Sequence, residues 1–213
     1  MIRSAFLTPL LVLVAGSTTA AELVVRDVRV GLDGRPLAYS FSLTSNAGQA
    51  SGNDAFQSAL ALEAGGRWSY ARAGDSVGLI VGADVMLDGW SNSGGGGMAT
   101  TWVRASVGPG WAINDRWTAM AEVGMQYGFS GLKMPASATS PAFTATGAAN
   151  GYDLRLGATW LASRQFGIGG HVGWLVTSHD VSGDNVHLTI KQSGWFVGIE
   201  AVWRFSDVPS RLE

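Results

Sequence analysis

The last extended segment of the chain, near its C-terminal end, alternates strictly between two kinds of side chain. Its odd positions are apolar: Trp195, Val197, Ile199, Ala201, Trp203 and Phe205. Its even positions include both charges of the stretch, Glu200 and Arg204. Because successive side chains of a strand point to opposite faces, one face is apolar and the other is polar. This pattern is typical of a transmembrane β-strand that has lipid on one side and a polar lumen on the other.

The composition agrees with strands that face lipid. Only 14% of the 213 residues are charged, against roughly 25% in soluble domains. The net charge of −2 argues against nucleic acid as a partner. There is no cysteine, so an exported chain of this kind takes its stability from backbone pairing and the bilayer rather than from disulfides.

Residues 1–21 are predicted to be a secretory signal. Arg3 supplies the positive charge, and the apolar run Ala5–Val14 is too short to span a bilayer as a helix. Cleavage fits after either Ala20 or Ala21, and a retained anchor is the alternative. We therefore expect three parts: a signal at 1–21, an outer-membrane barrel at 22–205 and a short tail at 206–213.

Eight extended segments predict an all-β fold, an eight-stranded antiparallel up-and-down transmembrane β-barrel. The first is interrupted by Asp33–Pro36, which leaves open whether Leu23–Leu32 and Leu37–Thr44 form one strand. The other predicted strands are Ala55–Trp68, Ser76–Trp90, Thr100–Ala112, Trp117–Phe129, Gly151–Ala162, Gln165–Ser178 and Leu188–Phe205. Short turns alternate with long predicted loops at Ser45–Asp54, Ser91–Met98, Ser130–Asn150 and His179–His187. This alternation indicates periplasmic turns and extracellular loops.

The charged positions of the predicted strands share one face. The expected lumen charges are Glu63, Arg67, Asp84, Arg104, Glu122, Asp153, Arg155, His171, Glu200 and Arg204, with Asp88 nearer the loops. They belong inside because Arg or Lys on the lipid face at mid-membrane costs roughly 2–4 kcal/mol. Eight strands leave an interior just wide enough for side chains. We expect a self-paired, packed lumen, with a gated ion or proton path as the alternative.

Aromatic side chains are expected at both membrane interfaces, where Trp and Tyr rings prefer to lie. The predicted interface residues are Trp68, Trp111, Trp117, Trp160, Phe166, Trp174, Trp195, Trp203 and Phe205. Phe56 is also expected to point outward, near the loop end. The strand termini thus predict two aromatic girdles.

The pattern predicts no catalytic residue, cofactor or metal site. Two alternatives concern residues near the end of the seventh strand. His179, Asp180 and Ser182 could support acyl hydrolysis, because His can act as base and Asp can orient it. His179, Asp180, Asp184 and His187 could bind a metal, although their spacing matches no recognised pattern.

From these features the chain resembles small eight-stranded bacterial outer-membrane β-barrels of the opacity and adhesion type. Trp203 and Phe205 resemble the signal read by the barrel assembly machinery, with Glu200 where glycine is usual. The resemblance implies a non-enzymatic monomer of the cell outer membrane, in contact with its lipids and lipopolysaccharide. It also implies a role in envelope structure or adhesion through loops that bind an extracellular protein or glycan.

Two further functions remain as alternatives. A lipid A deacylase is similar in strand number but has a His-x-Ser pair, which none of the three histidines forms here. A narrow channel for small apolar compounds needs an apolar upper lumen. The apolar inward residues Met86, Trp102, Met120 and Leu175 are expected to lie scattered among charges.

Overall fold

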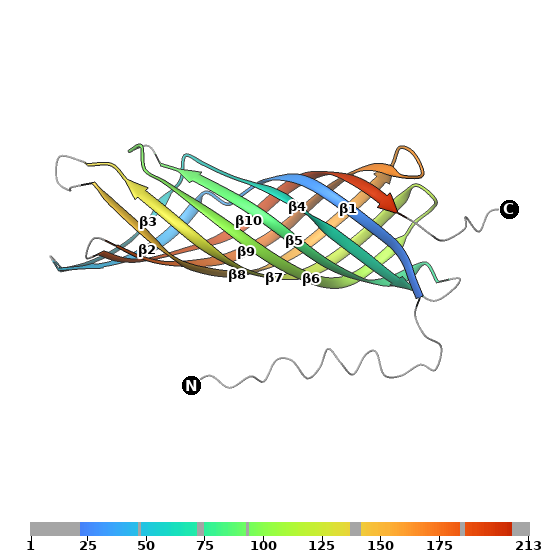
Figure 1. Cartoon of the computed structure of the whole chain (residues 1–213), viewed down its shortest axis with the longest axis horizontal. Helices are drawn as coiled ribbons and strands as arrows, with labels where there is room; N and C mark the ends of the chain where they lie inside the picture. The colour runs from blue at the N-terminus through green and yellow to red at the C-terminus, as the bar shows by residue number, and fades with distance from the viewer. Residues whose placement is uncertain are drawn as a thin grey trace, which may run out of the picture.

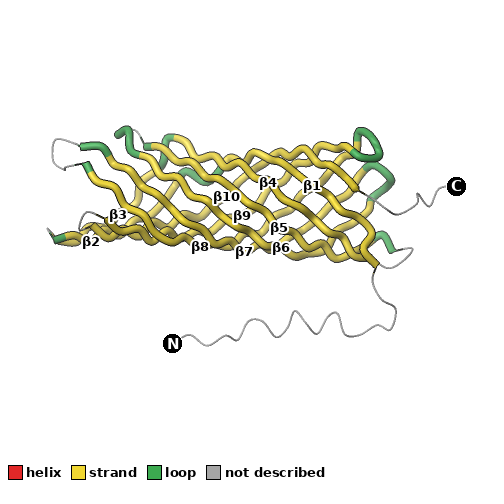
Figure 2. Tube along the Cα trace, in the orientation of Figure 1, coloured by secondary structure: helices red, strands yellow, loops and turns green. Residues whose placement is uncertain are grey.

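The computed structural model of the chain describes residues 22–46, 48–71, 75–92, 94–136, 142–183 and 186–205. Within these ranges it holds ten strands and no helix, so no described helix could cross a membrane. The predicted signal at 1–21 and tail at 206–213 lie outside the described residues. Figure 2 shows that strands make up nearly all of the described chain.

The ten strands form one antiparallel sheet. They are β1 (Glu22–Gly34), β2 (Ala38–Ser45), β3 (Gly48–Ala55), β4 (Ser58–Ala71), β5 (Val77–Ser91), β6 (Gly97–Ala112), β7 (Trp117–Met134), β8 (Phe143–Leu161), β9 (Phe166–Gly183) and β10 (Val186–Phe205). Apolar and polar side chains alternate along the ring strands, which suits a wall with different surroundings on its two sides, whereas β3 is mostly polar and exposed.

Eight of these strands close into a ring. β1 pairs with β4 on one edge and with β10 on the other, where Arg26 lies opposite Phe205. The remaining strands β4 to β10 pair in chain order. The predicted eight-stranded antiparallel barrel is thereby confirmed. Closure removes the free edges of the ring, and β1 begins at the same end of the barrel as β10 ends (Figure 1).

β2 and β3 form a hairpin at the opposite end of the barrel (Figure 1). The pairing of Tyr39 with Gln192 continues the register in which Gly34 pairs with Val197. β1 and β2 are therefore one strand, interrupted at Pro36, which has no N–H to donate to the sheet. In the described residues β3 pairs with β2 alone, so its other edge has no strand partner.

Three of the predicted long loops are largely strand. β7 extends to Met134 and β8 begins at Phe143, so most of the predicted loop Ser130–Asn150 is paired. β3 occupies much of the predicted loop Ser45–Asp54, and β9 and β10 shorten the last loop. The prediction was wrong because small polar residues were taken as loop formers, whereas an established ladder of hydrogen bonds extends through them.

A closed ring of paired strands predicts resistance to unfolding by detergent. The purified mature chain, folded in detergent, should migrate differently on a gel before and after boiling, because the ring opens only on heating. Its circular dichroism should be dominated by β-structure. Identical migration of heated and unheated samples, or a substantial helical spectrum, would contradict the closed barrel.

Candidate functional site

The polarity of the wall inverts along its length, as β10 shows. From Trp195 to Phe205 the outward side chains are apolar and exposed, and the inward ones include Glu200. Before Trp195 the outward residues are polar, among them Lys191, whereas the inward Leu188 and Ile190 are apolar and buried. We refer to the buried charged residues inside the zone from Trp195 to Phe205 as the lumen network. The apolar residues inside the zone before Trp195 are called the apolar cup.

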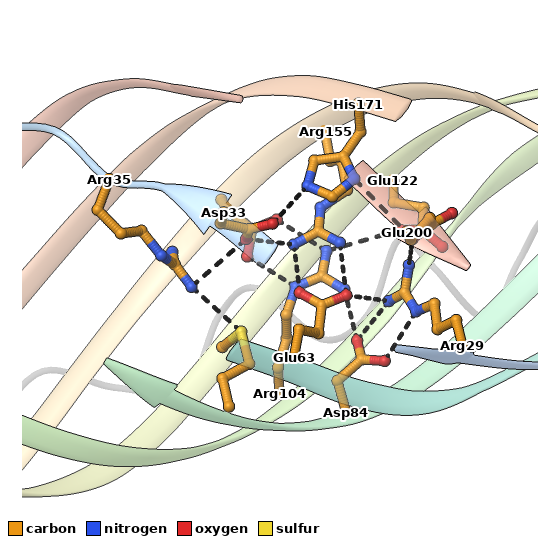
Figure 3. A network of polar contacts seen from close by, with 12 residues as sticks. Arg29, Asp33, Arg35, Glu63, Asp84, Arg104, Glu122, Arg155, His171 and Glu200 are labelled. Carbon is orange, nitrogen blue, oxygen red and sulfur yellow. Dashed lines mark hydrogen bonds and ion pairs between the residues drawn. The ribbon is translucent and has the colours of Figure 1, made fainter. Parts of the chain in front are cut away.

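The lumen network is a set of buried charges to which every strand of the ring contributes (Figure 3). Its members are Arg29, Asp33, Arg35, Glu63, Arg67, Asp84, Asp88, Arg104, Glu122, Asp153, Arg155, His171 and Glu200. Arg35 lies just beyond the end of β1, and the others lie on the ring strands. A buried charge is tolerated only when it is paired and hydrogen-bonded.

Two bidentate pairs link strands that are not neighbours in the ring. Arg104 on β6 donates to both carboxylate oxygens of Asp153 on β8, at 2.9 and 2.7 Å. Arg155 donates to both oxygens of Glu63, each at 2.8 Å. Planar two-point pairing of this kind is the strongest geometry that a guanidinium makes with a carboxylate.

The other arginines bridge carboxylates on different strands. Arg29 on β1 donates to Asp84 at 2.6 and 3.0 Å and to Glu200 at 3.2 Å. Arg67 on β4 donates to Glu122 at 3.0 Å and to the same Glu200 at 2.8 Å. These shared acceptors connect the pairs into one network across the lumen.

The first strand adds charges that the sequence interpretation missed. Asp33 lies 2.9 Å from His171 Nε2, and Arg35 lies 3.4 Å from Asp88. Arg204, predicted to belong to the network, instead pairs with Asp27 at 2.9 Å near the turn end. The strict alternation of Asp27, Arg29, Gly31 and Asp33 with Val28, Val30 and Leu32 was the available signal.

Glycine makes room for the network at close approaches. A Cβ atom on Gly124 of β7 would lie 2.6 Å from both Arg104 Nε and Asp153 Oδ2, inside their bidentate pair. A Cβ atom on Gly131 of the same strand would have no other atom within 4 Å. Gly124 is therefore required by the lumen charges, whereas Gly131 is not.

The apolar cup occupies the hairpin end of the barrel. Its cavity has a volume of about 280 Å³. The apolar lining comes from Tyr39, Phe41, Leu43, Phe56, Met98, Leu132, Met134, Phe143, Leu188 and Ile190. Asp54 is the one charged residue among the described lining and accepts a hydrogen bond from the Tyr39 hydroxyl at 3.2 Å. Burial and the neighbouring Asp54 raise the pKa of Tyr39.

A polar layer, the floor, separates the cup from the lumen network. Thr100 and Ser130 lie one inward position below the cup residues Met98 and Leu132. Ser130 Oγ lies 2.8 Å from His179 Nδ1 and 2.9 Å from Thr100 Oγ1, and His179 Nε2 lies 3.3 Å from Thr177. The imidazole of His179 is thus held by hydroxyl groups and is completely buried.

The two alternative sites near His179 do not assemble. His179 points into the barrel, whereas Asp180 and Ser182 are exposed on the outer face. Asp180 instead lies 3.1 Å from His187 Nε2. The hydrolase hypothesis is wrong for these residues because neighbours in a strand face opposite ways. Asp184 lies outside the described residues, and the described chain holds no cluster of metal-ligating side chains.

The predicted interface aromatics lie on the outer surface. Trp68, Trp111, Trp117, Trp160, Trp174, Trp195, Trp203 and Phe205 are exposed, and Phe166 is half-buried. Trp174 packs edge-on against Trp195, and Phe166 packs similarly against Trp203. Phe56, in contrast, is buried inside the cup, so its predicted outward orientation was wrong. It follows β3, in the zone where the outward side chains are polar.

The comparisons with known proteins identify the architecture. No protein-family model and no curated protein matches the sequence. The structure of the outer membrane protein OprG from Pseudomonas aeruginosa is similar with a TM-score of 0.52 and 10% identity, over 88% of this chain and 98% of that one.

Two other solved structures are less similar. The outer membrane protease OmpT from Escherichia coli has a TM-score of 0.47 and 9% identity over 89% of this chain and 99% of its own. Ail, the attachment invasion locus protein of Yersinia pestis, was solved in complex with the heparin analogue sucrose octasulfate. Its structure has a TM-score of 0.39 and 12% identity over 86% of this chain and 100% of its own. At such identities the likeness concerns the fold alone, which is that of a small outer-membrane β-barrel.

The bidentate pairing predicts a large cost for removing one partner. Arg104→Met should lower the free energy of unfolding by about 3–5 kcal/mol, because Asp153 is left charged and buried. Arg116→Met, in an exposed turn, should change it by less than about 0.5 kcal/mol. Urea titration in lipid vesicles measures the free energy of unfolding of both variants. Equal effects would mean that water solvates the orphaned carboxylate.

The glycines of β7 offer a second, steric test. Gly124→Ala should destabilise the barrel by about 1–3 kcal/mol, since the added methyl group must displace the Arg104–Asp153 pair. Gly131→Ala meets open space and should be neutral or slightly stabilising. The same urea titration compares the free energies of unfolding of the two variants. If Gly124→Ala were as stable as the wild-type chain, the Arg104–Asp153 pair would be able to shift without loss of stability.

Proposed function

We propose that this protein is a monomeric, non-enzymatic barrel of the bacterial outer membrane that binds small apolar molecules in its cup. The observation that carries the proposal is the cavity of about 280 Å³ among apolar side chains. Protein interiors are close-packed and contain few voids larger than a water molecule. A cavity of this size and lining approaches the range of about 300–1,000 Å³ found for ligand sites.

The inversion of polarity supports an orientation for the cup. Leu188 and Ile190 precede Trp195 on β10, so the cup lies on the far side of the loop-end aromatic residues from the turns. Outward residues there, including Lys191 and His187, are exposed and polar. In the proposed placement the cup projects beyond the outer leaflet and faces the cell exterior, and lipid surrounds the zone that contains the lumen network.

The lumen network supports binding rather than conduction. Its charges are nearly all inaccessible, and Trp102, fully buried above it, donates to Asp88 at 2.6 Å. Arg155 and Arg35 additionally lie 5.4 and 5.6 Å from the centre of the Phe196 ring. We propose that the network closes the barrel at membrane depth, as expected for an eight-stranded interior.

The polar floor supports a non-enzymatic site. A Ser–His pair needs a third group that orients the base, commonly a carboxylate. Thr177, not a carboxylate, lies beside His179 Nε2, at 3.3 Å. Ser130 and His179 are also fully buried below the cup. We propose that they form a hydrogen-bonded layer between the cup and the lumen charges.

Surface adhesion is a second candidate, favoured by the β2–β3 hairpin. Its side chains on β3 are mostly exposed and polar, and the outer edge of β3 has no strand partner in the described chain. Exposed Lys133 and Lys191 lie at the same end. These cations would suit an anionic glycan, the class of ligand bound to Ail in its crystal structure.

Filling the cavity tests the binding function. Leu43 lines the cup, so Leu43→Trp should abolish the binding of octane by occupying its space. Thr44→Trp is the matched control, because Thr44 is the next residue of β2 and is exposed on the outer face. The protein is labelled at methionine methyl groups, embedded in lipid nanodiscs and titrated with octane by NMR.

The two methionine positions separate binding from partition into lipid. Met98 lines the cup, whereas Met125 is 74% exposed on the outer face. A saturable shift of the Met98 signal, absent in Leu43→Trp and retained in Thr44→Trp, is the expected result. A Met98 signal that follows Met125, or that still responds in Leu43→Trp, would contradict the proposal.

A further inference from the structure

The indole N–H of Trp90 is a buried donor beside the cup for which the described residues provide no hydrogen-bond partner. Trp90 is the last residue but one of β5 and is 4% exposed. Its ring centre lies 4.7 Å from that of Phe56, which lines the cavity, and 4.5 Å from that of His179 in the floor. Its Nε1 has no hydrogen-bond partner among the described residues. The ring thus lies between the cavity and the floor with an unused donor.

A second tryptophan shows how such a donor is normally satisfied. The ring centre of Trp102, further into the barrel, lies 5.3 Å from that of His179, and its indole N–H donates to Asp88 at 2.6 Å. Buried tryptophan N–H groups usually find a partner, and those that do not require an explanation. In the described structure no hydroxyl of the floor accepts from Trp90, and those of Thr100 and Ser130 contact each other and His179.

We propose that the cup takes an uncharged molecule with an apolar body and one acceptor oxygen, to which Trp90 donates its indole N–H. This inference rests on the proposed binding function and specifies its ligand class. The acceptor replaces the partner that the fold does not provide. The apolar body fills the cavity between residues such as Leu132 and Ile190.

The charges at the cup support an uncharged ligand. The described lining includes no Lys or Arg, and its one carboxylate belongs to Asp54. A carboxylate ligand would therefore enter an apolar cavity with no cation to pair with it and with Asp54 nearby, which is unfavourable. Ketones, aldehydes, ethers and esters carry the required acceptor without a charge.

The test compares three probes of equal chain length: 2-octanone, octane and octanoate. The wild-type chain, with ¹⁵N-labelled indoles and labelled methionine methyl groups, is titrated with each probe in nanodiscs. The Met98 methyl signal reports occupancy of the cup, and the Trp90 indole signal reports hydrogen bonding. Trp90→Phe assigns the indole signal and removes the donor while keeping an aromatic ring. Tyr39→Phe is the matched control, because it removes a different polar atom from the lining.

In the expected result, octane and 2-octanone both shift Met98, but 2-octanone alone moves the Trp90 N–H signal downfield. The wild-type chain binds 2-octanone about fivefold more tightly than Trp90→Phe does, whereas octane binding is equal in both. Tyr39→Phe retains the preference, and octanoate binds more weakly than 2-octanone.

Two outcomes would overturn the inference, and they differ in meaning. If octane and 2-octanone shift Met98 but the Trp90 signal is insensitive to both, the binding function stands and the role of Trp90 is wrong. If no probe shifts Met98, the binding function itself fails. Both readouts use the wild-type chain, and if Trp90→Phe folds poorly the Trp90 indole signal is assigned instead from its through-space contacts with Phe56 and His179.

Discussion

The rest of the structure depends on what the outer face of the wall touches. Where the outward side chains are apolar, as at Val197 and Ile199, the outer surface suits lipid. The polar side chains of that zone then point into the interior. Where the outward side chains are Lys191 and His187, the wall suits water, and the interior is free to be apolar. One barrel therefore contains two interiors of opposite character, and the floor of hydroxyl groups and His179 joins them.

The charged interior constrains the wall in turn. Each guanidinium needs acceptors from more than one strand, so the network is complete only in a closed ring with one register. Arg29 shows this dependence, because its carboxylate partners lie on β5 and β10. Because Gly124 has no side chain, it leaves room for the Arg104–Asp153 pair. Pairing of opposite charges across strands is what makes a buried charge network tolerable.

Much of the barrel was predictable from local patterns, and the failures have physical reasons. Alternation identified the strands and the inward position of residues such as Glu122 and Arg155. It failed at Phe56, because the phase of apolar and polar residues inverts beyond the aromatic residues. It also failed at Arg29, because the interruption at Pro36 obscured the first strand. The cup was missed since its residues come from predicted loops as well as strands.

The sequence by itself determined the period of each strand and hence which side chains share a face, because that period is a property of the extended backbone. It also determined the number of strands in the ring and their antiparallel order, through the spacing of short turns, although not the β2–β3 hairpin. Only the tertiary structure decided which inward residues meet, since the register between strands and the closure of β1 on β10 set those distances. The pairing of Arg104 with Asp153, the burial of His179 and the unpartnered indole of Trp90 all follow from that closure.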